Sequence, residues 1–335
     1  MSPRRTRRRL FQLIALPWIV VGLLGTTSYL RAYDQHRGFP TLHRRRGVAA
    51  GRQLWIHFYS PALRRRADYI VYEPTGFTRG RRYPVLYLLH GSPGRPQTFI
   101  DIANIDVRID NLIARRRMRP MLLVFPDGRI NGSQFSDSEW ANTGTGRYEG
   151  YILDVVRDVD RRFPTLRQRR DRVIGGYSAG SLGALNAVLH YPQYFGGVEA
   201  WSGPFVEDRS SAVFAHESNA LIFFYSPYRF AGTIARYLRR YPLRAFIYCG
   251  RGDHDRREIP GLARALRAGG AVVQTAIYPG GHDWQLWNAH ISQMLLVASE
   301  FITHPAPRPV RYPRHHRRHR RPRGRSGRAR RAGSQ

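Results

Sequence analysis

The pentapeptide Gly176-Tyr177-Ser178-Ala179-Gly180 holds the residues whose types and spacing most clearly indicate chemistry. A serine between two glycines, placed after a strand and before a helix, is typical of a nucleophile elbow that exposes the hydroxyl. An apolar stretch, 172–175, precedes the serine, and residues 181–190 have helical character. We predict that Ser178 is a nucleophile and that the backbone N–H of Ala179 stabilises an oxyanion.

A second oxyanion donor is expected from the loop that follows an earlier strand. The apolar run 83–89 ends in His90-Gly91-Ser92-Pro93-Gly94, whose glycines allow the backbone to approach closely. We predict that the backbone N–H of Ser92 is this donor, with a plain β-turn as the alternative.

An acid and a histidine should follow the serine in that order along the chain. The apolar run 246–249 leads to Arg251-Gly252-Asp253-His254-Asp255, and the run 272–278 leads to Gly280-Gly281-His282. We predict that His282 is the general base and that Asp253 orients it, with Asp255 held in reserve. The alternatives are a solvated turn carboxylate for either aspartate and a packing histidine for His282.

Apolar runs that alternate with helical patterns must position these residues. Strands followed by helices predict an α/β fold with a doubly wound, mostly parallel sheet, as in α/β-hydrolases. The expected strands are 54–58, 68–72, 84–89, 121–125, 173–175, 197–201, 245–249 and 271–278, and the expected helices are 148–163, 181–190, 233–239, 261–267 and 291–302.

Residues from about 51 to 303 resemble the putative-esterase family of α/β-hydrolases, which includes feruloyl esterases, siderophore esterases, S-formylglutathione hydrolase and mycolyltransferases. The resemblance is carried by the segments 83–91, 175–185, 190–195, 249–253 and 280–284. It implies acyl chemistry on an ester or thioester through an acyl-enzyme. Asp253 looks like the acid of the family's G-x-x-D pattern, which supports it over Asp255.

Two further segments bear on the substrate. Residues 135–140 look like a region that borders the active site in the mycolyltransferases, which hints at a lipid or sugar ester. Those enzymes often carry Asp-Gly where this chain has His90-Gly91, so the resemblance favours the hydrolase branch. Residues 204–244 are expected over the cleft, where an aromatic cluster either binds an aromatic or acyl group or packs as a lid: Phe223, Phe224, Tyr225, Tyr228 and Phe230.

The charge is concentrated at the two ends of the 335-residue chain. The net charge is +32, all 55 basic residues are arginine, and 17 of these arginines lie in residues 1–9 and 306–335, which contain no acid. The rest of the chain therefore carries 32 − 17 = +15. Because we find no nucleic-acid-binding motif, we expect no nucleic-acid partner. The single cysteine, Cys249, rules out a disulfide within the chain.

The N-terminal 30 residues predict a signal peptide or signal anchor. Five arginines precede an uncharged run from Leu10 to Leu30, which places the arginines in the cytoplasm and the rest outside. No clear cleavage site follows, which favours a retained membrane anchor over a secreted protein. We expect a linker over 31–50, a hydrolase domain over 51–303 and a disordered basic tail over 304–335. The tail could bind anionic envelope polymers, and RNA or DNA binding is the rival role for it.

Together these features predict an extracytoplasmic serine carboxylesterase that needs no metal or organic cofactor. Its substrate would be a small-molecule, lipid or sugar ester. One alternative is an acyltransferase that uses the same three residues to pass the acyl group to a sugar or lipid. The other is a cell-surface binding protein that keeps the fold without catalysis.

Overall fold

A computed structural model describes residue 39 and residues 42–133 and 136–306 of the chain. The predicted signal segment and nearly all of the predicted basic tail lie outside these residues. Within the described ranges, no helix has the length and apolar character needed to cross a bilayer.

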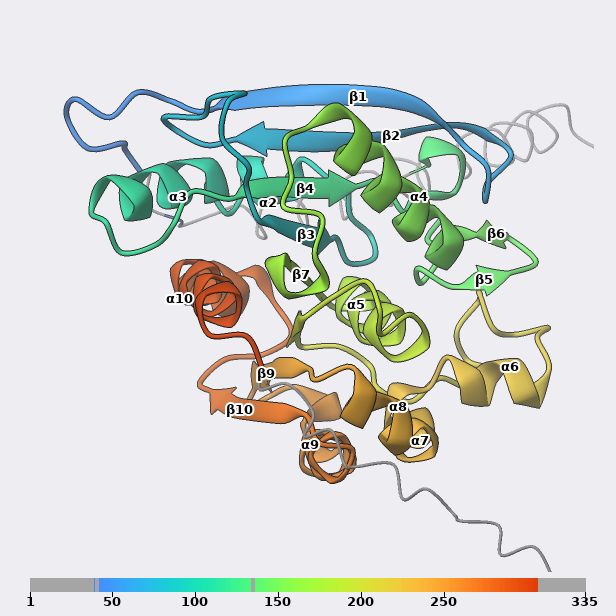
Figure 1. Ribbon diagram of the computed structural model, residues 1–335. Helices are drawn as coiled ribbons and strands as arrows, with labels where there is room; N and C mark the ends of the chain where they lie inside the picture. The colour runs from blue at the N-terminus through green and yellow to red at the C-terminus, as the bar shows by residue number, and fades with distance from the viewer. Residues whose placement is uncertain (1–38, 40–41, 134–135, 307–335) are drawn as a thin grey trace, which may run out of the picture.

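An eight-stranded sheet forms the centre of the molecule (Figure 1). Its strand order is β1-β2-β4-β3-β7-β8-β9-β10, in which β2 runs antiparallel to both of its neighbours and all other pairs are parallel. This confirms the predicted mostly parallel sheet. The strands are β1 Arg52–Ser60, β2 Arg65–Glu73, β3 Val85–Leu89, β4 Leu122–Pro126, β7 Arg172–Tyr177, β8 Gly197–Trp201, β9 Arg244–Gly250 and β10 Val272–Tyr278, and a separate pair is β5 Asn142–Thr143 with β6 Gly146–Arg147.

Helices cover both faces of the sheet, as a doubly wound fold requires (Figure 1). One face packs against α3 (Ile105–Ala114) and α10 (Trp284–Thr303). The other packs against α4 (Tyr148–Arg162), α5 (Ala179–His190) and α9 (Ile259–Ala268). The remaining helices are short: α2 Thr98–Asp101, α6 Asn219–Phe224, α7 Pro227–Phe230 and α8 Ala235–Arg240, with 3₁₀ turns at Ile130–Gly132, Arg169–Asp171, Ala231–Ile234 and His254–Arg257.

The central strands are buried along their whole length because helices cover them on both sides. Every residue of β3, β4, β7 and β8 is buried, which explains why β3 and β4 are continuous apolar runs in the sequence. By contrast, β1 and β10 form the two edges of the sheet and keep exposed side chains.

Some elements begin or pack differently from the sequence prediction. The last helix begins at Trp284 rather than at 291, because the carboxylate of Asp283 accepts a hydrogen bond from the amide of Leu286 (2.9 Å) and caps it. Helix α3 was not predicted. In the segment predicted as a linker, Arg44 contacts this helix through ion pairs to Asp106 and Asp110 (2.6 and 2.8 Å).

Candidate active site

Ser178 lies in a sharp turn between the last residue of β7 and the first residue of α5. Its backbone has φ 54° and ψ −125°, a strained conformation for a residue with a side chain. The glycines on either side are needed for space. A Cβ on Gly176 would lie 2.4 Å from the carbonyl oxygen of Leu89, and one on Gly180 would lie 2.0 Å from it. The Gly-x-Ser-x-Gly pattern therefore does form the predicted elbow.

His282 lies in the loop after β10, with its ring beside the nucleophile. Its Nε2 is 3.0 Å from Ser178 Oγ. The loop is held on two sides, because Asp283 caps α10 and the carbonyl of Gly280 accepts a hydrogen bond from the amide of Gly252 (2.8 Å). That second bond joins the loop to the one that carries Asp253.

Asp253 follows β9 and completes a line of hydrogen bonds from the serine. Its Oδ2 is 3.0 Å from Nδ1 of His282, and its Oδ1 accepts a hydrogen bond from the amide of Asp255 (3.2 Å). The residue is only 2% exposed. Burial alone would raise the pKa of Asp253, but its hydrogen bond and charge interaction with His282 hold that pKa below its usual value. The carboxylate is therefore ionised at neutral pH.

Asp255, the reserve candidate for the acid, pairs with a different histidine. Its Oδ1 pairs with Nε2 of the exposed His254 at 3.0 Å. Asp253, Asp255 and His282 each offer one potential metal-ligand atom, and these atoms lie within 4.8 Å of one another. Both ring nitrogens of His282 are already hydrogen-bonded to Asp253 and Ser178, so the geometry favours a proton-transfer role for this histidine.

The loop after β3 runs directly beside the nucleophile. A Cβ on Gly91 would lie 2.9 Å from Cβ of Ser178, so the backbone of the next residue, Ser92, is close to the elbow. Across residues 42–133 and 136–306, no protein acceptor binds the backbone N–H of Ser92 or that of Ala179. Both predicted oxyanion donors are thus available to a ligand, and we keep them as proposed donors.

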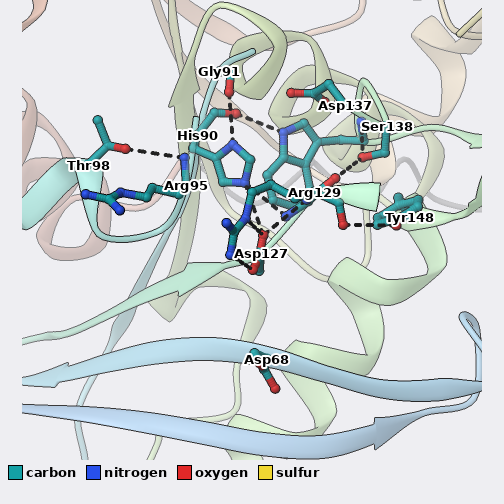
Figure 2. A network of polar contacts seen from close by, with 12 residues as sticks. Asp68, His90, Gly91, Arg95, Thr98, Asp127, Arg129, Asp137, Ser138 and Tyr148 are labelled. Atoms are coloured by element: carbon teal, nitrogen blue, oxygen red, sulfur yellow. Dashed lines mark hydrogen bonds and ion pairs between the residues drawn. The ribbon is translucent and has the colours of Figure 1, made fainter. Parts of the chain in front are cut away.

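A buried network, drawn in Figure 2, holds this loop in place. His90 is fully buried: its Nδ1 lies 2.9 Å from the carbonyl oxygen of Gly91, and its Nε2 accepts a hydrogen bond from the amide of Gly128 (3.0 Å). Since one nitrogen faces an acceptor and the other a donor, His90 is the neutral tautomer with its proton on Nδ1. Its own carbonyl accepts a hydrogen bond from the indole N–H of Trp140 (3.0 Å).

Three more side chains belong to this network: Asp127, Arg129 and Ser138. Arg129 binds both carboxylate oxygens of Asp127, at 2.9 and 2.7 Å. Burial by itself would raise the pKa of Asp127, but the hydrogen bonds and positive charge of Arg129 bring it well below its usual range. Ser138 donates a hydrogen bond to the carbonyl of Gly128 (2.7 Å) and accepts one from the amide of Trp140 (3.2 Å).

Through Trp140, the segment 136–140 therefore packs against the loop that carries Ser92 and against α5. Phe135, in the same predicted segment, lies outside the described residues. The part played by Trp140 was not predicted. The indole packs so closely against α5 that a Cβ on Gly183 would lie 2.4 Å from its Cβ, and no local sequence pattern signals this contact.

The predicted aromatic cluster packs mainly at the other end of α5. His190, the last residue of that helix, stacks on Phe224 with ring centroids 3.6 Å apart and contacts Tyr225 and Phe230. The helix has 12 residues and so is about 18 Å long, which places these three rings far from Ser178. Of the five aromatic side chains, Phe223 and Tyr228 are exposed, so most of the cluster packs inside the protein, and the structure does not place these rings over the cleft as predicted.

The strand order and the strained elbow define the fold of an α/β-hydrolase. Solved structures agree with this class. A ferulic acid esterase superposes with a TM-score of 0.66 at 22% identity, over 75% of this chain and 99% of the other. An S-formylglutathione hydrolase from Staphylococcus aureus superposes with a TM-score of 0.61 at 19% identity, over 75% of this chain and 100% of the other.

The family follows from the sequence match: residues 60–298 match the family model described as "Putative esterase", and the chain belongs to that family. It is 26% identical over 265 residues to an acetyl esterase of Caldicellulosiruptor saccharolyticus, which covers 71% of this chain and 95% of that protein. It is 29% identical over 170 residues to an esterase of Mycobacterium tuberculosis, covering 50% of this chain. The match spans only 36% of that longer protein.

Proposed function

We propose that the protein is a serine carboxylesterase that cleaves its substrate through an acyl-enzyme on Ser178. The observation that carries the proposal is the continuous hydrogen-bonded line from Ser178 Oγ through the ring of His282 to Asp253, with both steps at 3.0 Å. The family and the acetyl esterase relative support an ester as the bond that is cleaved.

In the first half-reaction, Nε2 of His282 accepts the proton of Ser178 Oγ as this oxygen attacks the ester carbonyl carbon. The resulting oxyanion is stabilised by the backbone N–H groups of Ala179 and Ser92. When the tetrahedral intermediate collapses, the carbon–oxygen bond to the alcohol breaks and His282 returns the proton to the departing alcohol.

In the second half-reaction, water replaces the alcohol. His282 accepts a proton from the water as its oxygen attacks the acyl-enzyme, and then protonates Ser178 Oγ as the carboxylic acid leaves. Asp253 accepts a hydrogen bond from Nδ1–H of His282 throughout, which keeps Nε2 free as the base and stabilises the charged ring.

Hydrolysis of p-nitrophenyl acetate by two serine variants tests this proposal. Ser178→Ala removes the nucleophile and should lower kcat by at least about 10³-fold. Ser92→Ala is the matched control: it removes a hydroxyl near the site but keeps the backbone N–H, so activity should stay within about 3-fold of the wild type. A Ser178→Ala variant that keeps the wild-type rate would contradict the proposal.

The same assay separates hydrolysis from acyl transfer. An esterase releases the free acid whether or not an acceptor sugar is present. An acyltransferase would form an acylated sugar, which mass spectrometry of the products detects. The match between His90-Gly91 and the hydrolase branch leads us to expect the free acid.

We also propose that the domain acts outside the cytoplasm and is held there by the N-terminal segment. The five arginines before the uncharged run Leu10–Leu30 support this orientation. The arginine-rich tail would then meet anionic envelope polymers. A C-terminal tag that proteases reach in intact cells would agree with the proposal, whereas a tag accessible only after lysis would contradict it.

A further inference from the structure

A groove with a volume of about 670 Å³ lies between α9 and β10. The two elements are neighbours, and β10 is an edge strand of the central sheet (Figure 1). The apolar lining of the groove includes Ile259 and Ala263, which are buried, and Ile277, which is 44% exposed. The volume lies within the range of about 300 to 1,000 Å³ that is typical of small-molecule sites. The groove is therefore large enough for an organic ligand.

Four arginines line the groove together with these apolar residues: Arg256, Arg257, Arg264 and Arg267. All four are exposed, and no aspartate or glutamate of the described residues belongs to the lining. Arginine stays positively charged at every pH at which proteins normally fold. The groove, which we call the arginine groove, therefore combines concentrated positive charge with an apolar floor.

The helix explains why two of the arginines lie together. Arg264 and Arg267 are three positions apart, a spacing that makes side chains neighbours on a helix surface. Leu262 and Leu266 are buried, which leaves the two arginines on the exposed side of α9. The other two arginines belong to the 3₁₀ turn His254–Arg257 that precedes the helix. Because like charges at such spacing repel each other, an anion that binds between them stabilises the arrangement.

The acids closest in sequence to the groove have other partners. Asp255 pairs with His254, with 3.0 Å between the carboxylate oxygen and Nε2. The carboxylate of Glu258 accepts a hydrogen bond from the amide of Phe205 at 3.0 Å. These two carboxylates therefore do not neutralise the arginines of the groove.

No other acid within the described ranges neutralises the groove either. None of its four arginines forms an ion pair there, although ten arginines elsewhere do. Arg256 and Arg267 each donate a single hydrogen bond, to a backbone carbonyl. The ends of the chain cannot supply the missing negative charge, because residues 1–9 and 306–335 contain 17 arginines and no acid.

Guanidinium groups bind phosphate through pairs of parallel hydrogen bonds, and a phosphate group carries up to two negative charges and three acceptor oxygens. Several arginines can therefore converge on one phosphate. We propose that the arginine groove binds a ligand that carries phosphate and rests its organic part on Ile259, Ala263 and Ile277. None of the candidate catalytic or oxyanion residues lines the groove, so the inference is independent of the ester chemistry proposed for Ser178.

Thermal unfolding of the full-length protein in the presence of inorganic pyrophosphate tests the proposal. A ligand that binds a site formed only by the folded chain raises Tm, whereas binding that is equal in the folded and unfolded chains leaves Tm unchanged. The measurement therefore separates the groove from the other arginines of the chain. We expect a saturable rise in Tm of about 2 °C or more, relative to sodium chloride at the same ionic strength.

Two double variants assign the rise in Tm to the groove. Arg257→Gln/Arg264→Gln removes two charges from side chains that form no hydrogen bond within the described ranges, and at least about tenfold more pyrophosphate should be needed for the same rise. Arg66→Gln/Arg79→Gln is the matched control, because it removes two exposed arginines outside the groove and should respond like the wild type. The absence of a rise in the wild type, or equal responses of the two variants, would overturn the proposal.

Two further probes distinguish the sources of the phosphate in the same assay. Dihexanoyl phosphatidylglycerol, kept below its micelle concentration, represents a lipid headgroup, and glycerol 3-phosphate represents a small phosphate ester. A rise in Tm with either probe that is lost in Arg257→Gln/Arg264→Gln supports the proposal, and the probe that acts at the lower concentration identifies the source. If neither probe gives a rise that depends on these arginines, the proposal is wrong. Ester hydrolysis enters none of these measurements, so they stand apart from any failure of the proposed esterase function.

Discussion

Nε2 of His282 lies 3.0 Å from Oγ of Ser178, although 104 positions separate the two residues in the chain. The sheet brings them together. Ser178 follows β7, Asp253 follows β9 and His282 follows β10, and all three strands run parallel through the pairs with β8 and with each other. Their carboxyl ends therefore meet at one edge of the sheet, where α/β folds form their ligand sites.

Substitutions of Asp253 and Asp255 should show which of these two aspartates orients His282. Asp253→Asn removes the charge that holds the His282 tautomer, so kcat for p-nitrophenyl acetate should fall by about 10³- to 10⁴-fold. Asp255→Asn should lower kcat much less, because Asp255 pairs with His254 rather than with His282. Equal losses in the two variants would show that the acid had been assigned to the wrong residue.

The direction in which the pKa of Asp253 is shifted predicts how its contribution to stability depends on pH. Its pKa is below the usual value in the folded protein, so its contribution to the free energy of unfolding is present at neutral pH and is lost as pH falls through the folded value. We expect the stability difference between wild type and Asp253→Asn to shrink as pH falls from about 6 to about 2, as measured by urea unfolding. A constant difference would contradict this pKa direction.

Trp140 should act as a positioning residue for the oxyanion loop. Trp140→Phe keeps an aromatic ring but removes the indole N–H that binds the carbonyl of His90. We expect a decrease in kcat of about tenfold with little change in KM, because a displaced loop weakens binding of the oxyanion more than of the substrate. Trp201→Phe, which removes the indole donor to Glu199, is the matched control. Similar kinetic losses in both variants would indicate general destabilisation instead.

Glu207 should destabilise the folded protein as pH rises. Its pKa is raised from 4.5 to about 9, so the folded state holds this proton more tightly than the unfolded chain does. The free energy of unfolding therefore falls between these two values. Glu207→Gln removes this loss, and its Tm should exceed that of the wild type by an amount that grows from about pH 5 to about pH 9, by roughly 3 °C or more. A difference in Tm between the two proteins that stays constant with pH would contradict this prediction.

The nucleophile elbow and the loops that carry the three candidate residues could be predicted because their signals are local. The two glycines around Ser178 predict a tight turn. The structure shows that a Cβ at Gly176 or Gly180 would clash with the carbonyl oxygen of Leu89, so both positions require glycine. Asp253 was chosen from its place after an apolar run and was supported by the family's G-x-x-D pattern, and the geometry brings Asp253, not Asp255, to His282. The parallel sheet followed from continuous apolar runs.

Features that depend on contacts between distant segments could not be predicted. Trp140 donates a hydrogen bond to the carbonyl of His90, 50 positions away in the chain, and no pattern in the sequence around either residue predicts this contact. Glu207 looks like an ordinary loop carboxylate in the sequence, but the fold buries it. The aromatic residues of 204–244 suggested a ligand site, but three of them pack around His190 instead.

The central claim is that Ser178 is an activated nucleophile, and peptide mapping after reaction with a fluorophosphonate probe tests it most directly. Attack of Ser178 Oγ on phosphorus expels fluoride and leaves a stable adduct whose mass identifies the modified peptide. We predict a single adduct on Ser178 in the wild-type protein, much slower labelling of the Asp253→Asn protein, and none at this position after Ser178→Ala. A folded wild-type protein that stays unlabelled, or carries the adduct on another residue, would contradict the account.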